Sequence, residues 1–231
     1  MNLPLESALD KIAKRSADLI NSGDIVGLGS GSTVARFAKA LGTRIERESL
    51  KFSVVPSSTQ AWLLAKENGL PLGVDSAHCP TELDIAIDGA DQISISTRSM
   101  IKGGGGALLK EKIILSSSKK CYILADQSKY VPKLIRSVPV EVVQFSLVSV
   151  ESKLRSSLGG KCDLRKLDKG YPFFTESGNV IIDCQFEDSI SDPLSLENKI
   201  KSIPGVVEAG IFNCRIDEFL RANHDGTFDA F

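Results

Sequence analysis

The chain has 231 residues, with 28 lysines and arginines against 29 aspartates and glutamates, so its formal net charge is −1. This length can bury the core of one large domain, or of a main domain with a smaller one. A near-neutral chain without blocks of basic residues disfavours nucleic acid or a membrane surface as main partner. No apolar run reaches the roughly 18 residues that a membrane-spanning helix needs.

The N-terminal segment has the pattern of an amphipathic helix. Its apolar residues recur at three- and four-residue steps from Leu5 to Ile20, and Ser22-Gly23 ends the pattern. The segment lacks the apolar core and the cleavage site of a signal peptide. We therefore expect a cytoplasmic protein, with the plastid stroma as the alternative if a transit peptide was removed.

Cysteine and histidine are too few and too scattered to predict a metal centre. The five cysteines form no CxxC pair and have no regular spacing, and there are two histidines. A site built from sulfur and imidazole is hard to assemble from this set. We predict a protein of a reducing compartment that uses no metal and no cofactor.

A strand, a glycine loop and a helix come next along the chain. Residues 24–28 predict a buried strand, Gly29-Ser30-Gly31-Ser32-Thr33 a loop, and residues 34–41 a helix that Gly42 closes. Such a loop presents backbone N–H groups and hydroxyls at a helix N-terminus, where the dipole favours an anion. The loop predicts a phosphate site, and a tight turn that binds nothing is the alternative.

Two nucleotide-binding interpretations of this loop fit less well. Ser32 occupies the third glycine position of the dinucleotide pattern G-x-G-x-x-G, and the next predicted strand, residues 52–55, is followed by no acid for a ribose hydroxyl. A Walker loop is also excluded, because no Gly-Lys-Ser/Thr follows the glycines.

The same order of elements continues after the loop. Residues 60–68 and 107–116 predict helices, and residues 83–87 and 120–125 predict buried strands. This alternation predicts a parallel sheet with helices on both faces, whose ligands lie beyond the carboxyl ends of the strands.

The pattern changes near residue 138. The predicted order becomes strand, helix, strand, strand, helix, strand, at residues 140–145, 147–158, 161–167, 180–186, 193–203 and 206–212. This β-α-β-β-α-β order is the ferredoxin-like unit. The predicted fold class is therefore α/β, with a Rossmann-like main domain at residues 1–135 and 208–231 and a smaller ferredoxin-like α+β domain at residues 136–207.

Charge and glycine are concentrated between Asp88 and Glu111. Asp88 and Asp91 follow the strand at residues 83–87, Lys102 directly precedes four glycines, and Glu111 lies about one turn into the next helix. Abstracting a proton beside a carbonyl needs a carboxylate near the carbon, and a cation or N–H donors near the oxygen. Glu111 can supply the first and Lys102 the second. Ordinary ion pairs of Lys102 with Asp88 or Glu111 are the alternative.

These motifs, in this order, resemble ribose-5-phosphate isomerases of the A type. The segments that carry the resemblance are residues 27–33, Asp88-Gly89-Ala90-Asp91, Lys102 with residues 103–106, Glu111, and residues 126–129, 139–142, 178–181 and 203–208. The resemblance covers nearly the whole chain. Three ordered glycine or acid motifs are far more specific than a single one.

The resemblance implies interconversion of D-ribose 5-phosphate and D-ribulose 5-phosphate by metal-free proton transfer through an enediolate. This reaction belongs to the pentose phosphate pathway, or to the Calvin cycle in a plastid. The resemblance implies Glu111 as the base and Asp88 as the group that handles hydroxyl and ring-opening protons. Asp91 and Lys102 would orient the sugar and steady the oxyanion.

The resemblance also implies substrate contacts and an assembly. The implied substrate-binding residues are Ser30, Gly31, Ser32, Thr33, Gly89, Ala90, Gly103, Gly104, Gly105 and Lys129. The expected partners are a small-molecule sugar phosphate, no nucleic acid, no membrane, and further copies of the chain in a homodimer or homotetramer.

The chain departs from the family pattern at a few positions. Ser30 stands where the family often has threonine, Gln92 replaces the usual glutamate, and residues 215–231 match no familiar pattern. A non-catalytic sugar-phosphate sensor is the alternative function, although no DNA-binding helix pair precedes residue 25. A lactonase of similar fold would require a histidine near the site, and neither His78 nor His224 lies in a core motif.

Overall fold

The computed structural model describes residues 3–73, 78–186 and 189–231, and the chain divides into two compact units. Unit 1 comprises Met1–Ala90, Lys110–Lys129 and Cys214–Phe231, and unit 2 comprises Asp91–Leu109 and Tyr130–Asn213. The division into domains at residues 135 and 208 stays a prediction.

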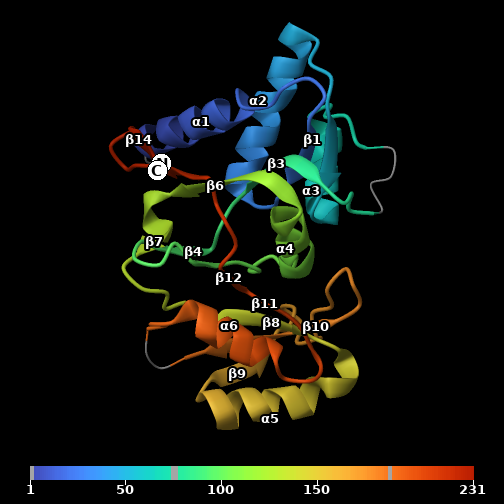
Figure 1. The fold of residues 1–231 in the computed structure, drawn as a ribbon, viewed down its shortest axis with the longest axis vertical. Helices are drawn as coiled ribbons and strands as arrows, with labels where there is room; N and C mark the ends of the chain where they lie inside the picture. The colour runs from blue at the N-terminus through green and yellow to red at the C-terminus, as the bar shows by residue number, and fades with distance from the viewer. Residues whose placement is uncertain (1–2, 74–77, 187–188) are drawn as a thin grey trace. The chain divides into compact units, whose positions relative to one another are not determined.

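Unit 1 is built on a six-stranded sheet (Figure 1). Its strands are β1 (Ile25–Leu28), β2 (Ser53–Pro56), β3 (Leu83–Asp88), β6 (Ser118–Asp126), β13 (Glu218–Ala222) and β14 (Phe228–Ala230). The order is β14-β13-β6-β3-β1-β2, and every neighbouring pair is parallel except β13 with β14. The predicted parallel sheet is confirmed, and its C-terminal hairpin is an addition that the sequence pattern did not indicate.

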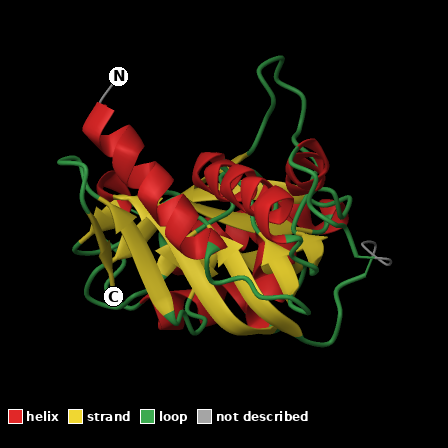
Figure 2. Ribbon diagram, turned by 90° about the horizontal axis from the view of Figure 1, so that it is seen from above, coloured by secondary structure: helices red, strands yellow, loops and turns green. Residues whose placement is uncertain are grey.

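Helices cover both faces of this sheet, as predicted. They are α1 (Leu3–Ala17), α2 (Ser32–Glu48), α3 (Thr59–Glu67) and α4 (Leu108–Ser116). Val26 and Leu28 belong to the core that α1 and α2 cover, and α1 lies across the strands (Figure 2). Because side chains alternate along a strand, Gly27 faces the other side. There a Cβ would lie 2.4 Å from Cγ2 of Ile114 on α4.

Helix α2 is longer than predicted. Gly42 predicts its end, but α2 continues to Glu48 and is capped by Ser49, whose φ is 51°. Gly42 is needed inside the helix because a Cβ there would lie 2.4 Å from the carbonyl oxygen of Asn68. Glycine in mid-helix costs about 1 kcal/mol relative to alanine. Here the glycine allows α2 to pack closely against the backbone of Asn68.

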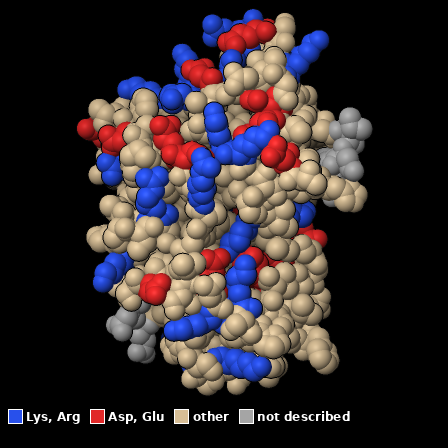
Figure 3. Space-filling view, viewed as in Figure 1, with Lys and Arg blue, Asp and Glu red and all other residues tan. Residues whose placement is uncertain are grey.

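Acidic and basic side chains are interspersed on the face seen in Figure 3. In unit 1, Arg36 pairs with both Glu6 and Asp10, and Lys119 pairs with Asp84. Within the part of the chain that the structure describes, no helix has the length and apolar character of a membrane span.

Unit 2 contains the predicted ferredoxin-like order. Strands β8 (Val138–Val142), β9 (Lys161–Leu164), β10 (Val180–Gln185) and β11 (Val206–Ala209) accompany helices α5 (Leu147–Leu158) and α6 (Pro193–Lys201). The four strands form an antiparallel sheet in the order β11-β8-β10-β9. Residues of both helices and all four strands share one core, so this part of the fold prediction is confirmed.

A third sheet, also in unit 2, was not predicted. It has the order β12-β5-β4-β7, from β4 (Gln92–Ser94), β5 (Met100–Ile101), β7 (Tyr130–Val131) and β12 (Ile211–Phe212). The single strand predicted at residues 206–212 is therefore wrong, since β11 pairs with β8 while β12 pairs with β5.

Gly210 divides these two strands because the backbone is crowded there. Its N–H donates to the carbonyl of Pro139 at 2.7 Å, and its carbonyl accepts from the N–H of Lys102 at 3.0 Å. A Cβ at position 210 would lie 2.5 Å from the carbonyl oxygen of Lys102. The backbone of Lys102 is thereby tied to the ferredoxin-like strands.

Two cysteines of unit 2 are paired. Cys162 of β9 and Cys184 of β10 are opposite each other in the antiparallel ladder and form a disulfide. This disulfide was not predicted from the sequence, which indicated a reducing compartment. The two cysteines are 22 residues apart, and only the strand register brings them together. Cys79 and Cys121 keep free thiols.

Candidate functional site

The glycine loop of unit 1 joins β1 to α2 at the carboxyl end of the parallel sheet. Gly31 precedes the helix with a φ of 96°, a value that favours glycine, and α2 begins at Ser32. As the N-cap residue, Gly31 has no side chain with which to cap this start, and the first turn holds no acidic residue. The first N–H groups of the helix, including those of Ser32 and Thr33, therefore lie at the positive end of its dipole. An anion would be stabilised there.

Ser30 joins the two predicted catalytic carboxylates of unit 1. Its hydroxyl donates to Oε1 of Glu111 at 2.7 Å, and its backbone N–H donates to Oδ1 of Asp88 at 3.2 Å. The N–H of Gly89 donates to the same Oδ1 at 2.7 Å. Asp88 is 2% exposed and Glu111 is 4% exposed. These two acids are therefore buried and organised by hydrogen bonds, rather than being solvated surface charges.

Gly29 allows Asp88 to approach the loop this closely. A Cβ at position 29 would lie 1.9 Å from Oδ1 of Asp88, far inside van der Waals contact. The N–H of Gly29 donates to the carbonyl of Ile87 at 2.9 Å, so the loop starts as a continuation of the ladder between β1 and β3. Asp88, the last residue of β3, therefore lies over the start of the glycine loop.

The structure does not bring every predicted residue of unit 1 together. Gly89 and Ala90 follow Asp88 and are half-buried. Lys129 is half-buried at the end of the short helix η1 (Gln127–Lys129), which follows β6. Within the described ranges, Lys129 has no hydrogen bond or ion pair with another predicted site residue. Its role in the substrate site stays a prediction.

Asp91, Lys102 and the glycine run lie in unit 2. The N–H of Gly104 donates to Oδ2 of Asp91 at 2.8 Å, and the N–H of Asp91 donates to the carbonyl of Ile101 at 2.9 Å. Lys102 is 3% exposed, and its Nζ lies 5.6 Å from the centroid of the Phe212 ring. This is a cation–π distance. Gly210 therefore holds the backbone of Lys102, and Phe212 of β12 contacts its ammonium group.

The glycine run is a tight turn. Gly103 and Gly106 have φ values of 103° and 84°, which favour glycine, and the N–H of Gly106 donates to the carbonyl of Gly103 at 3.0 Å. Gly103 and Gly106 are buried, whereas Gly104 and Gly105 are exposed. The turn therefore presents its two middle residues outward.

Sequence reasoning missed Arg165. Its guanidinium donates to the carbonyl oxygens of Gly103 and Gly104, at 2.8 and 3.1 Å, and pairs with Asp183. A single arginine after a strand, far along the chain from the glycines, carries no sequence signal for this contact. Only the fold brings it to the turn.

Gln92 has a structural role that accounts for its departure from the family pattern. The side chain is buried, and Oε1 accepts from the backbone N–H groups of Ile135 at 2.7 Å and Arg136 at 3.0 Å. A glutamate carboxylate accepts hydrogen bonds in the same way. The glutamine therefore preserves this acceptor, while it removes the charge and replaces the second carboxylate oxygen by an NH2 donor.

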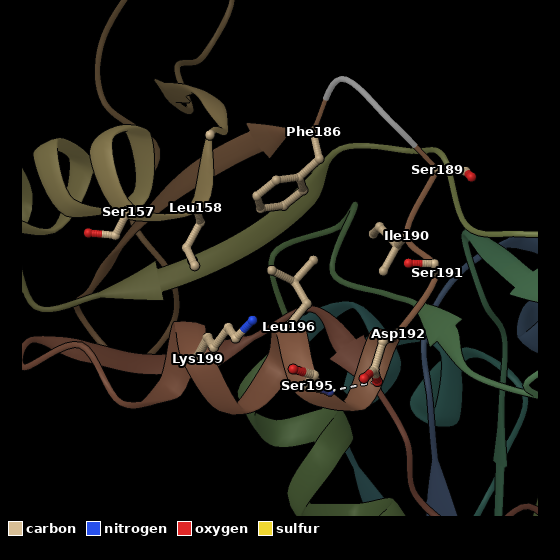
Figure 4. Close-up of a pocket in the computed structure, with 11 residues that line it drawn as sticks. Ser157, Leu158, Phe186, Ser189, Ile190, Ser191, Asp192, Ser195, Leu196 and Lys199 are labelled. Carbon is tan, nitrogen blue, oxygen red and sulfur yellow. Dashed lines mark hydrogen bonds between the residues drawn. The ribbon is translucent and has the colours of Figure 1, made fainter.

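A hollow in unit 2 contains none of the predicted site residues (Figure 4). Its volume is about 470 Å³, and Leu158, Phe186 and Leu196 form its apolar side. Among the described residues that line it, the carboxylate is that of Asp192, which caps α6 by accepting from the N–H of Ser195 at 3.0 Å. Because none of the predicted site residues line it, this hollow gives no support to the predicted chemistry.

The described residues contain no group of three or more His, Cys, Asp or Glu side chains arranged to hold a metal ion. A lactonase would need a histidine in the site, and both His78 and His224 are exposed.

Comparison with known proteins identifies the family. The model of "Ribose 5-phosphate isomerase A (phosphoriboisomerase A)" matches residues 53–226. The ribose-5-phosphate isomerase A of Methanosarcina acetivorans is 45% identical over 212 residues, which cover 91% of this chain and 88% of that protein. The ribose-5-phosphate isomerase A of Thermosynechococcus vestitus is 44% identical over 206 residues, covering 87% of this chain and 85% of that protein.

Solved structures agree with the sequence comparison. The structure of ribose 5-phosphate isomerase A from Methanocaldococcus jannaschii has a TM-score of 0.89 at 37% identity, with 98% of each chain covered. A D-ribose-5-phosphate isomerase in complex with phospho-erythronic acid also has a TM-score of 0.89, at 35% identity and with 98% of each chain covered. The chain belongs to the ribose 5-phosphate isomerase A family.

Proposed function

We propose that this chain interconverts D-ribose 5-phosphate and D-ribulose 5-phosphate. The observation that carries the proposal is the contact of Ser30 with both Glu111 and Asp88, two buried acids beside a helix start whose N-cap residue is a glycine. Aldose–ketose isomerisation of a sugar phosphate needs carboxylates for proton transfer and an anion site for the phosphate. Family membership supports the same assignment.

Glu111 is the proposed base. The isomerisation removes a proton from C2 of the open-chain aldose and returns a proton to C1, so one carboxylate between adjacent carbons can perform both transfers. Glu111 stands in the first turn of α4, and the hydrogen bond from Ser30 fixes its Oε1. Burial keeps water from competing for the proton.

Asp88 is the proposed group for hydroxyl and ring-opening protons. Its Oδ1 accepts from the backbone N–H groups of Ser30 and Gly89, so main-chain donors fix the orientation of its carboxylate. A carboxylate held in this way is suited to taking a proton from one sugar oxygen and passing it to another.

The groups proposed to stabilise the enediolate oxygens belong to unit 2. Lys102 and the N–H groups of residues 103–105 are the proposed donors, because backbone N–H groups and a cation stabilise the negative charge that develops on an oxygen. Asp91 is the proposed sugar-orienting carboxylate, and it accepts from the N–H of Gly104.

The phosphate is assigned to Ser30, Gly31, Ser32 and Thr33 at the start of α2, together with Lys129. The start of α2, with a glycine as N-cap residue and no acidic residue in its first turn, supports this placement. A solved relative is a complex with phospho-erythronic acid, which supports a sugar phosphate as the ligand class. No metal enters the proposed reaction, because the enediolate charge is assigned to Lys102 and N–H donors.

A homodimer or homotetramer is a further proposal that rests on family resemblance. A cytoplasmic location is proposed from the N-terminal segment, which lacks the features of a signal peptide, with the plastid stroma as the alternative location. Phe145 and Val148 support an interface, because these large apolar side chains are 101% and 79% exposed. Sedimentation velocity at micromolar concentration tests the assembly, and a purely monomeric protein would refute it.

The test of the proposed reaction is a conversion assay on the chelator-treated chain. Proton NMR with ribose 5-phosphate is expected to show equilibration with ribulose 5-phosphate in the presence of EDTA. A protein that binds ribose 5-phosphate but forms no ribulose 5-phosphate would refute the isomerase and leave a sugar-phosphate sensor in its place.

A further inference from the structure

Arg165 holds the glycine run of unit 2 by its backbone. Its Nη1 donates to the carbonyl oxygens of Gly103 and Gly104, at 2.8 and 3.1 Å. Its Nε and Nη2 donate to the two carboxylate oxygens of Asp183, at 2.8 and 2.5 Å. A guanidinium presents its donors in a rigid planar fork. Asp183 therefore fixes one edge of the fork while the other edge holds two successive peptide groups.

The direction of two N–H groups follows from these carbonyl contacts. In a trans peptide the C=O and the following N–H point in opposite directions, and the described chain has no cis peptide bond. The carbonyl of Gly103 points to Arg165, so the N–H of Gly104 points away from it and donates to Asp91. The carbonyl of Gly104 likewise directs the N–H of Gly105 away from Arg165. Gly105 is exposed, and its N–H has no hydrogen bond within the described chain.

The same arginine is part of a second contact with the turn. A Cβ at Gly106 would lie 2.5 Å from Cζ of Phe173, so the ring packs directly on that glycine. The N–H of Phe173 donates to the carbonyl of Arg165 at 2.9 Å, and the guanidinium lies 5.9 Å from the ring centroid. Arg165 and Phe173 therefore contact three of the four glycines.

A buried carboxylate holds the segment that carries Phe173. Oε1 of Glu141, on β8, accepts from Oγ1 of Thr175 at 2.8 Å and from Nδ2 of Asn179 at 2.9 Å. Glu141 and Asn179 belong to two of the segments that resemble the isomerase family, and neither has a part in the proposed chemistry. Their contact gives both segments a structural role, because it fixes the turn at residues 175–179 that follows Phe173.

We propose that Arg165 is a positioning residue for the isomerase reaction. Four consecutive glycines have more backbone freedom than any other four residues, and an oxyanion donor is effective only when its direction is set before the reaction. Arg165 sets the direction of these donors by fixing the carbonyl groups of Gly103 and Gly104. The N–H of Gly105 then points outward, and the N–H of Gly104 holds Asp91. The role rests on the proposed isomerase function, and Arg165 acts through the glycines without touching the substrate.

The test compares Arg165→Met with Arg155→Met as a matched control. Arg155 belongs to the same unit and makes comparable bonds, to Glu151 and to the carbonyl of Cys162, but it makes none to the glycine run. We expect Arg165→Met to lower kcat about 10- to 100-fold with KM changed less than about threefold, since oriented donors act mainly in the transition state. Arg155→Met should change kcat less than about twofold.

Two further readouts separate positioning from general stability. Amide hydrogen exchange in peptides covering residues 103–106 should accelerate in Arg165→Met and stay unchanged in Arg155→Met, while β1 and β3 stay protected in both. Arg165→Lys should stay impaired, because an ammonium group cannot span Asp183 and two carbonyls, whereas methylguanidinium should restore part of the kcat of Arg165→Met.

Several outcomes would overturn the proposal. They are a kcat for Arg165→Met within twofold of the parent, an equal loss in Arg155→Met, or unchanged exchange at residues 103–106. If Arg165→Met does not fold, Asp183→Asn replaces it, and a parental kcat in that variant would equally count against the proposal. An inactive parent would refute the isomerase function instead, and the exchange experiment would still decide whether Arg165 fixes the glycine turn.

Discussion

The hydroxyl of Ser30 lies 2.7 Å from Oε1 of Glu111, and its backbone N–H lies 3.2 Å from Oδ1 of Asp88. One residue of the glycine loop therefore contacts the last residue of β3 and the first turn of α4. The proposed phosphate loop and the two proposed catalytic acids of unit 1 form one hydrogen-bonded group. A change in the loop should therefore alter the position of the Glu111 carboxylate, the proposed base.

The Ser30 hydroxyl is expected to contribute to turnover. Ser30→Ala removes the donor to Glu111, and a hydrogen bond to a charged group contributes about 1.5–3 kcal/mol, so kcat should fall roughly 10- to 100-fold. Ser30→Thr keeps the hydroxyl and should retain most of the parental kcat. Steady-state kinetics with ribose 5-phosphate measures both. Equal impairment of the two variants would show that the hydroxyl is not the group that matters.

Gly29→Ala is expected to abolish most activity by displacing Asp88. The added Cβ would lie 1.9 Å from Oδ1 of Asp88, so the carboxylate or the loop must move. A displacement of about 1 Å at a catalytic group can cost 10²-fold in rate. Gly73→Ala is the control, because a Cβ there would meet its nearest atom only at 3.7 Å. Kinetics indistinguishable from the parent in Gly29→Ala would contradict the placement of Asp88 over the loop.

Asp84 is expected to make stability depend on pH in the acid range. The ammonium of Lys119 lies 2.8 Å from Oδ1 of Asp84 and the N–H of Ile25 lies 2.9 Å from its Oδ2, and these contacts hold the pKa of Asp84 below its ordinary value. A lowered folded-state pKa adds stability above the unfolded value of about 3.9, and that stability is lost as the pH falls through the folded value.

Urea unfolding at pH 7 and pH 3 tests this dependence. Asp84→Asn should lower the free energy of unfolding relative to the parent at pH 7, and the difference should shrink at pH 3. Glu82→Gln is the control, because Glu82 also pairs with Lys119 but is the more exposed carboxylate, with 63% of its side-chain surface accessible against 33% for Asp84. A difference for Asp84→Asn that is constant with pH would argue against the contact.

Cys121 is expected to resist alkylation in the folded protein. Burial raises the pKa of Cys121 to about 12, and its Sγ contacts the carbonyl of Leu115 at 3.1 Å. Because the thiolate is the reactive form, iodoacetamide at pH 8 should modify exposed Cys79 at least about 100-fold faster. In urea, where the thiol regains an ordinary pKa of about 8.5, the two rates should converge. Peptide mass spectrometry measures both, and equal rates in the native protein would contradict the burial.

The layered fold could be predicted from local patterns because each element carries its own signal. Residues 147–158 have helical spacing and a following glycine pair, and α5 has these limits. The strand at residues 83–87 is an apolar run that ends in Asp88, and β3 places that aspartate at the carboxyl end of the sheet. The acid and glycine motifs were found because strand and helix ends are where such residues gather.

The parts that the sequence could not predict depend on contacts between distant segments. Gly42 resembles a helix terminator, yet it is a packing position that only the approach of Asn68 explains. Gly210 separates two strands because the backbone of Lys102 lies against it. Arg165 reaches carbonyls 62 and 61 residues away. None of these relationships leaves a periodicity or a spacing in the chain.

The most direct measurement of the central claim follows solvent deuterium with Glu111→Gln beside the parent. The EDTA-treated parent, incubated with ribose 5-phosphate in D2O, should incorporate deuterium at C1 of ribulose 5-phosphate or C2 of ribose 5-phosphate. Glu111→Gln should still bind ribose 5-phosphate but lose exchange and turnover by roughly 10²-fold or more, because an amide cannot accept the proton. Exchange at the parental rate in Glu111→Gln would contradict the account.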